Sequence, residues 1–202
     1  MKRKKMILYG FFTTLIVVGF LAWKYTSRTA YEAAEYTVVE SEGDFEIRDY
    51  PELVLATTEM RSRSPEGDGS GDGSFMRLFG YISGENEQQQ KVAMTVPVFM
   101  EAGDSEESGQ MGFVVPKQVA ADNVPEPTST QVKVRKRPGG RFAVIRFSGK
   151  MTEAKIAEAK AKLEKWLAEK ELVGKDNYEF AGYDPPWTPG FLRRNEVLIR
   201  VE

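Results

Sequence analysis

The sequence contains neither histidine nor cysteine among its 202 residues. Without them, the chain can form no Ser-His-Asp triad, no thiolate nucleophile and no ordinary zinc site. Its carboxylates cluster in segments such as Glu101–Glu107, where a solvated loop is the expected state. The composition therefore argues against most classes of enzyme, and no disulfide can stabilise the fold.

A complete calcium-binding loop is also missing. Asp68, Ser70 and Asp72 resemble the beginning of an EF-hand loop, but Phe79 stands at the twelfth position, where such a loop needs a bidentate glutamate. The glycine- and serine-rich residues 61–74 contain too little apolar material to pack. The sequence therefore predicts an irregular loop here and no metal site.

One long uncharged run is present, at residues 6–23, directly after the basic residues 2–5. Its length is close to the roughly 17-residue lower limit for a membrane-spanning helix. Residues 1–24 are therefore predicted to form an anchor that uses residues 6–23 to cross a lipid bilayer. The alternative is a cleaved signal peptide, but Trp23 and Lys24 occupy positions where such a peptide needs small residues.

The charge distribution gives the anchor an orientation. The basic cluster predicts a single-pass protein whose N-terminus is cytoplasmic, and, in a bacterium, a periplasmic domain held at the inner membrane. Beyond Lys24 the chain carries 23 basic and 30 acidic residues, a net charge of −7. This acidic balance argues against a nucleic-acid partner. Residues 25–35 are predicted to be a tether, and residues 36–202 one domain.

Two amphipathic helices and several strands are predicted within that domain. The first helix has Phe75, Leu78, Phe79 and Ile82 at helical spacing and ends at Gly84. The second begins after Thr152, and its apolar side consists of Ile156, Ala159, Leu163, Trp166 and Leu167. Segments with a period of two predict strands at residues 36–40, 45–50, 53–60, 92–98, 111–115, 132–137, 141–148, 178–183 and 196–201.

The order of these elements repeats. Residues 36–116 and 130–202 both run strand, strand, helix, strand, strand, and we expect residues 132–137 and 141–148 to form a hairpin. Since neither half can close a core alone, the pattern predicts an α+β fold with pseudo-two-fold symmetry. Its expected form is a distorted antiparallel or mixed β-barrel with two flanking helices.

Five sequence blocks resemble the SOUL family of heme-binding proteins. In YISGENEQQQKVAMTVPV, residues 81–98, a helix end with glycine and asparagine precedes a basic residue and an M-T-x-P-V strand. The other blocks, in the family's order, are FEIRDYPELVLATTE, VPEPTSTQVKV, FAVIRFSG and AGYDPPWTPGFLRRNEVLI. The resemblance covers residues 36–202 and implies the same distorted barrel with two helices.

The resemblance also implies a site. Some family members hold a porphyrin in an apolar groove beside the first helix, and the matching residues here are Phe75, Met76 and Phe79. Tyr183, Pro186, Trp187 and Phe191 would form the facing wall, and Arg77, Arg193 and Arg194 are the candidate partners of the propionates.

Ligation of the iron by histidine, proposed for some members, cannot apply to this chain. The remaining candidate iron ligands are Met76, Tyr81 and Tyr183. The alternative is that Phe75, Phe79 and Trp187 simply belong to the core, and that Arg194 with its neighbours locks a loop by hydrogen bonds.

Three functional hypotheses follow from these observations. The leading one is a non-catalytic, membrane-anchored domain that binds heme or another tetrapyrrole. The second is an accessory subunit of an integral inner-membrane complex without a ligand of its own, in which Gly10 and Gly19 allow close helix packing. The third is a small-molecule hydrolase on an effector-binding-like fold, for which likeness of fold is a poor warrant.

The charge bias at the N-terminus predicts the topology. A protease added to spheroplasts is expected to digest the domain beyond Lys24 and to leave the N-terminal lysines protected. Immunoblotting with tags at the two ends measures this directly. Protection of the whole domain would contradict the predicted orientation.

Overall fold

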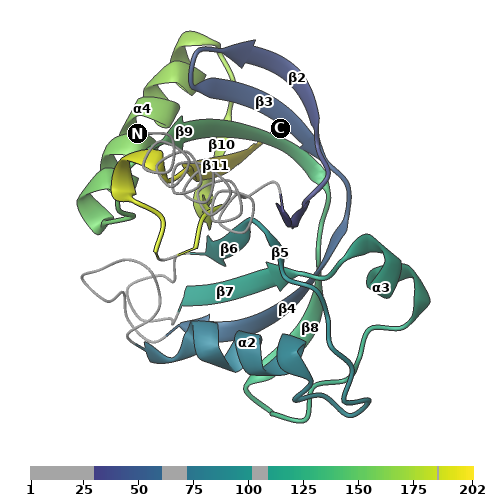
Figure 1. Cartoon of the computed structure of the whole chain (residues 1–202). Coiled ribbons are helices and arrows are strands. Elements are labelled where there is room, and N and C mark those ends of the chain that lie inside the picture. The colour runs from purple at the N-terminus through teal and green to yellow at the C-terminus, as the bar shows by residue number, and fades with distance from the viewer. Residues whose placement is uncertain (1–29, 61–71, 102–108, 186) are drawn as a thin grey trace, which may run out of the picture. The chain divides into compact units, whose positions relative to one another are not determined.

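Nine strands form one antiparallel sheet in the computed structural model, which describes residues 30–60, 72–101, 109–185 and 187–202 (Figure 1). The predicted anchor lies outside these residues. None of the helices in the described ranges is both long and apolar enough to cross a membrane. The predicted α+β class is confirmed.

The elements follow the chain in two similar series. The first series is β3 (Phe45–Tyr50), β4 (Leu53–Met60), α2 (Ser74–Ser83), β6 (Val98–Glu101) and β7 (Gly109–Val114). The second is β8 (Val132–Arg137), β9 (Gly140–Phe147), α4 (Glu153–Glu169), β10 (Gly174–Gly182) and β11 (Asn195–Val201). Outside the two series are β1 (Glu32–Ala33), β2 (Thr37–Glu42), β5 (Thr95–Val96), α3 (Lys117–Asp122) and the short helix η3 (Gly190–Leu192).

The two series exchange their first strands. β3 pairs with β9, and β8 pairs with β4, so the expected hairpin between β8 and β9 is wrong. Pro138 and Gly139 instead carry the chain from one half of the sheet to the other. A Cβ atom on Gly139 would lie 2.7 Å from the carbonyl oxygen of Tyr50. The segment at Gly139 and the segment at Tyr50 therefore approach too closely for a side chain at position 139.

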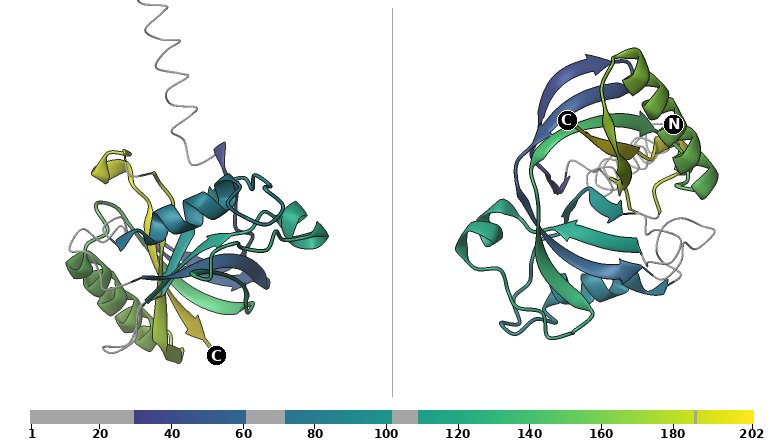
Figure 2. Two further views of the ribbon diagram at one scale, coloured as in Figure 1. Left: turned by 90° about the horizontal axis from the view of Figure 1, so that it is seen from below. Right: turned by 180° about the vertical axis from the view of Figure 1, so that it is seen from behind.

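The predicted barrel is also wrong. The strand order is β2-β3-β9-β11-β10-β6-β7-β4-β8, which leaves β2 and β8 as the two edges of an open sheet. These edges lie at opposite ends of the sheet (Figures 1 and 2). Pro51 and Pro138 lie between the ladder of β3 with β9 and that of β4 with β8, where a residue without a backbone N–H is tolerated.

Both longer helices pack on the same face of the sheet. Cross-strand partners in one continuous row, all facing the helices, are Met111, Met100, Phe180, Val197 and Ile145. The second helix begins after Thr152, whose hydroxyl accepts a hydrogen bond from the amide of Lys155, and it buries the predicted apolar side. α2 ends at Gly84, which has a φ of 116°, as its sequence predicts. α3 was not predicted, because none of its residues is buried.

The packing of α4 gives a test of its two sides. Trp166 is 5% exposed, and its ring stacks on Phe45 at a centroid distance of 5.1 Å. Trp166→Ala is therefore expected to lower the free energy of unfolding by about 3–5 kcal/mol, because it leaves a cavity. Lys162→Ala, on the exposed side, is expected to cost less than about 0.5 kcal/mol. Urea denaturation of both variants measures the difference, and equal losses would contradict this packing.

Candidate functional site

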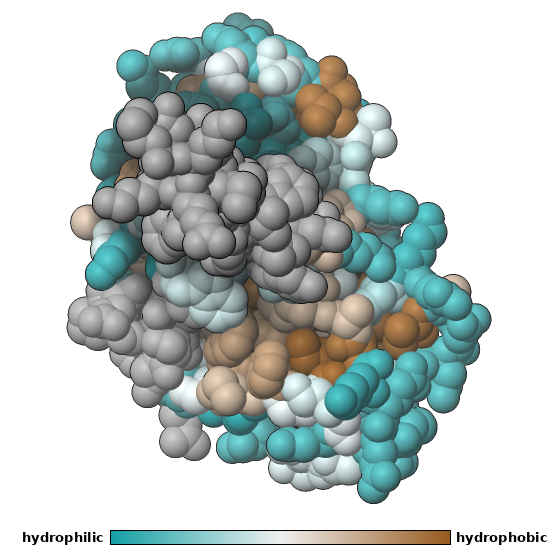
Figure 3. Space-filling model, viewed as in Figure 1, coloured by the Kyte–Doolittle hydropathy of each residue, from teal (hydrophilic) through white to brown (hydrophobic). Residues whose placement is uncertain are grey.

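The first helix displays an apolar side to solvent. Met76 is 62% exposed and Phe79 is 44% exposed. Phe75 is half-buried, stacks on Phe79 at 6.2 Å between ring centroids and meets the edge of Phe113 at 5.2 Å. Apolar residues gather in the lower part of the face shown in Figure 3, in the region of α2. Phe75 thus joins the core, while Phe79 and Met76 extend an apolar surface outward.

Arg77 lies on another side of the same helix. Two positions along an α-helix correspond to a rotation of about 200°, so Arg77 is almost opposite Phe79. Its guanidinium donates hydrogen bonds to the hydroxyl of Thr58 (3.0 Å) and to the carbonyl oxygens of Glu59 (2.6 Å) and Asp72 (3.0 Å). This arginine therefore fastens α2 to the end of β4.

The predicted facing wall divides into an exposed part and a buried part. Trp187 and Phe191 are 67% and 78% exposed, whereas Tyr183 is buried. Pro186 lies outside the described residues. The structure therefore does not gather the predicted wall residues into one surface.

Polar contacts hold the loop between β10 and β11. The amide of Arg194 donates to Asp184 Oδ2 (2.6 Å), and the amide of Tyr183 donates to the carbonyl oxygen of Arg194 (3.2 Å). Arg193 Nε donates to the carbonyl oxygen of Thr188 (2.8 Å). These hydrogen bonds join the two ends of the loop, and the exposed side chains of Trp187 and Phe191 lie between those ends.

Tyr183 and Arg194 meet at a buried carboxylate. Glu196 is fully buried and accepts two hydrogen bonds from the guanidinium of Arg48, at 2.8 and 3.0 Å. Arg194 Nε donates to the same carboxylate at 2.9 Å, and the Tyr183 hydroxyl donates at 2.8 Å. The interpretation of Arg194 as a residue that locks a loop agrees with this arrangement.

Further groups surround Arg48. Its Nε donates to Glu46 Oε2 at 2.6 Å and its Nη1 to the Tyr50 hydroxyl at 3.1 Å, while the guanidinium lies 4.2 Å from the ring centroid of Tyr36. We refer to Tyr36, Glu46, Arg48, Tyr50, Tyr183, Arg194 and Glu196 as the buried ion cluster. Its residues come from β3 and β11 and from positions next to the ends of β2, β10 and β11, on the face opposite the helices.

The ionisation of Glu196 is fixed by its partners. Burial alone would raise the pKa of this carboxyl, but the hydrogen bonds and positive charges of Arg48 and Arg194 lower it. For Arg48, burial would lower the pKa, but the hydrogen bonds and negative charge of Glu196 raise it. Glu196 and Arg48 therefore face each other as an ionised pair at neutral pH.

Two of the three candidate iron ligands are buried phenols. Burial raises the pKa of Tyr183 well above its ordinary value and that of Tyr81 to about 12. The hydroxyl of Tyr81 donates to the carbonyl oxygen of Pro125 at 2.7 Å. Of the three candidates, Met76 alone has an exposed side chain.

The ion cluster was largely missed from the sequence. Glu46 and Arg48 alternate with Phe45 and Ile47, a pattern that ordinarily indicates a solvated strand face. The one available signal was the pair of complementary charges in two separate strands, Arg48 in FEIRDY and Glu196 in NEVLIRV. Sequence alone does not show that these strands face each other across β9.

Removing the central carboxylate tests the cluster. Glu196→Gln is expected to lower the unfolding free energy by about 3 kcal/mol or more at pH 7, because it leaves buried arginine charge uncompensated. Since the pKa of Glu196 is depressed in the folded state, its stabilisation exists above the unfolded pKa of about 4.3 and is lost as pH falls through the lower folded value. The difference from the parent should therefore shrink in acid.

Urea denaturation at pH 7 and at acidic pH measures both effects. The control is Glu158→Gln, which removes an exposed ion pair with Lys162 (2.6 Å) and should leave stability almost unchanged at either pH. A Glu196→Gln protein as stable as the parent at pH 7 would contradict the role given to this carboxylate.

Comparison with solved structures shows the fold alone. The C-terminal domain of EcmrR aligns over 83% of this chain and 98% of its own length, with 13% identity and a TM-score of 0.57. A protein from Listeria innocua described as a hydrolase aligns over 81% of this chain and 94% of its own length, with 10% identity and a TM-score of 0.58.

Sequence comparison is more specific. Heme-binding protein 1 of Xenopus laevis is 32% identical over 158 residues, which cover 76% of this chain and 81% of that protein. Human heme-binding protein 2 is 29% identical over 163 residues, which cover 78% of each. Residues 31–200 match the profile of the family described as SOUL heme-binding protein. The chain is therefore a member of the SOUL heme-binding protein family.

Proposed function

We propose that this protein binds heme or a related tetrapyrrole against the exposed apolar side of α2. The observation that carries the proposal is the surface formed by Met76 and Phe79, which is supported from beneath by the ring of Phe75. Membership of a family whose relatives are named heme-binding proteins supports the same ligand.

The chemistry of this surface fits a flat, largely apolar ligand. Burial of apolar area yields about 25 cal/mol per Å², so a macrocycle lying across these side chains can bind without a strong metal ligand. Phe79 offers a ring for stacking, and Met76 offers a thioether to the iron. Arg77 and Arg194 are engaged with protein oxygens, so apolar contact supplies most of the affinity in this proposal.

The same proposal includes the anchor. Residues 6–23 would hold the domain at the extracytoplasmic face of the membrane, and the domain would bind its ligand without catalysing a reaction. The accessory-subunit hypothesis shares this placement and differs in having no ligand. Because the hydrolase-like neighbours share only a fold with this chain, they give no support to a catalytic role.

Hemin titration tests the surface. In lipid nanodiscs, with empty discs subtracted, Phe79→Ala is expected to weaken hemin binding by about 1–3 kcal/mol, because it removes a stacking surface. Val173→Ala removes an exposed apolar side chain outside α2 and should have no effect. Met76→Ala should shift the Soret band if the thioether contacts iron.

Two results would contradict the proposal. One is a spectrum and melting temperature that micromolar hemin leaves unchanged. The other is undiminished binding by a folded Phe79→Ala protein. Either result would favour the accessory-subunit hypothesis.

A further inference from the structure

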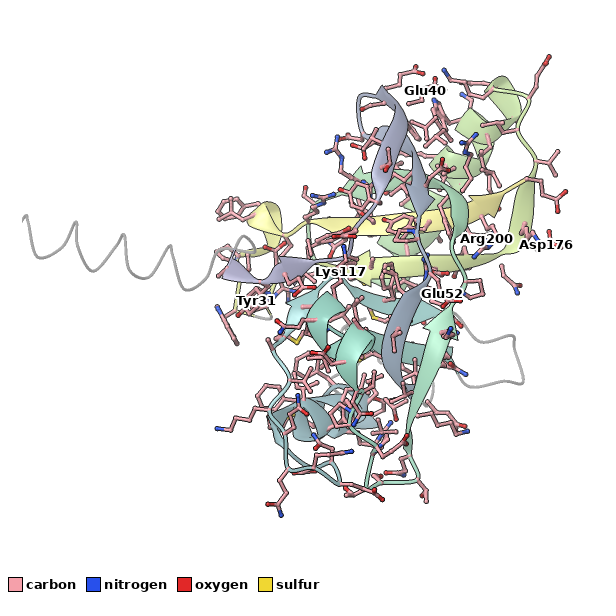
Figure 4. All side chains as sticks on the ribbon, turned by 90° about the vertical axis from the view of Figure 1, so that its right-hand side faces the viewer. Tyr31, Glu40, Glu52, Lys117, Asp176 and Arg200 are labelled. Carbon is pink, nitrogen blue, oxygen red and sulfur yellow. The ribbon has the colours of Figure 1, made fainter. Side chains whose placement is uncertain are left out.

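Two exposed aromatic residues lie at the end of the domain that contains Tyr31. Phe191 lies within η3 and Trp187 precedes it, and their exposed fractions of 67% and 78% are large for aromatic side chains. Tyr31 and η3 both lie at the left end of the domain in Figure 4, and Asp176 lies at the opposite end. The two aromatic side chains therefore share an end with the first residues of the domain.

Residues 32–34 are fixed to the domain at this end. β1 pairs in parallel with β5, with Glu32 opposite Thr95 and Ala33 opposite Val96. The amide of Ala34 donates to the carbonyl oxygen of Val96 at 2.8 Å. Glu32, which belongs to the segment predicted to be a tether, is thus held in a strand.

The remaining connection to the anchor is short. Residues 25–30 separate Lys24 from Tyr31. Even when fully extended, this connection spans at most about 25 Å. If residues 6–23 cross the bilayer, as the proposed function holds, Tyr31 at this end of the domain lies within about 25 Å of the membrane surface.

The loop that contains η3 is suited to that surface. Hydrogen bonds of Asp184, Tyr183 and Arg194 hold its two ends together, and Trp187 and Phe191 lie between these ends. The carbonyl oxygen of Gly190 accepts a hydrogen bond from Gly149, and this contact places the exposed Lys150 next to the loop. Exposed aromatic side chains on a loop with a neighbouring lysine favour the headgroup region of a bilayer.

We propose that Trp187 and Phe191 insert into the headgroup region of the same bilayer that holds the anchor. The domain then contacts the membrane at two points, the anchor and the η3 loop, and its orientation on the surface is fixed. This inference rests on the anchor of the proposed function. It assigns the loop aromatics to lipid, in place of the porphyrin-facing wall that the sequence predicted.

The absence of cysteine allows a direct test with the full chain. Phe191→Cys and Asp176→Cys each create one labelling site, the first on the loop and the second at the opposite end of the domain. Each labelled protein is reconstituted into liposomes whose lipids contain a nitroxide quencher close to the headgroup. The label at position 191 should be quenched at least about twofold more strongly than the label at position 176.

A second substitution provides a further control. Adding Trp187→Asp to the Phe191→Cys protein should bring the quenching at position 191 close to that at position 176, because a charged side chain disfavours insertion. Melting temperatures of the labelled proteins verify that each is folded, as expected for changes at exposed positions.

The outcomes separate this inference from the proposed function. If the protein floats with liposomes but the label at position 191 is quenched no more than that at position 176, the loop does not touch lipid and the inference is overturned. If the protein does not float with liposomes, the anchor and the inference both fail, whereas hemin binding is judged by its own titration. If Trp187→Ala weakens hemin binding as much as Phe79→Ala does, the loop belongs to the porphyrin site and the inference is again overturned.

Discussion

The buried carboxylate of Glu196 is the interaction that joins β3 to β11 and to the loop between β10 and β11. It is fully buried, and a buried carboxylate is costly unless several donors compensate it. Arg48, Arg194 and Tyr183 supply those donors from β3, from the loop before β11 and from the end of β10. One ionised group therefore ties β3, far away in the sequence, to both ends of the loop that contains η3.

A second constraint is the exchange of strands between the two series. β3 completes the sheet of the second series through β9, and β8 completes that of the first through β4. Neither first strand therefore pairs with another strand of its own series, and β3 has β2, outside both series, as its second neighbour. The strands of both series form one hydrogen-bonded sheet with a core on each face, so we expect the two series to unfold as one cooperative unit.

Local signals in the sequence predicted more than long-range ones could. The periodicity of α4, its cap at Thr152 and the end of α2 at Gly84 depend on neighbouring residues, and all agree with the structure. The partner of a strand depends on residues far along the chain, and a period of two specifies only which side chains share a face. The hairpin and the barrel were wrong for this reason.

The candidate site likewise combines a feature that local sequence predicts with one that depends on distant residues. Sequence spacing placed Phe75, Leu78, Phe79 and Ile82 on one broad apolar stripe, but the sheet buries only part of it, and Phe79 remains exposed. An apolar stripe wider than its packing partner leaves surface for a ligand. With no histidine in the chain, such a surface can hold a tetrapyrrole chiefly through its flat apolar face, so affinity would depend on how α2 is supported. Arg77 and Phe75 provide that support, one through hydrogen bonds to β4 and the other through contact with Phe113.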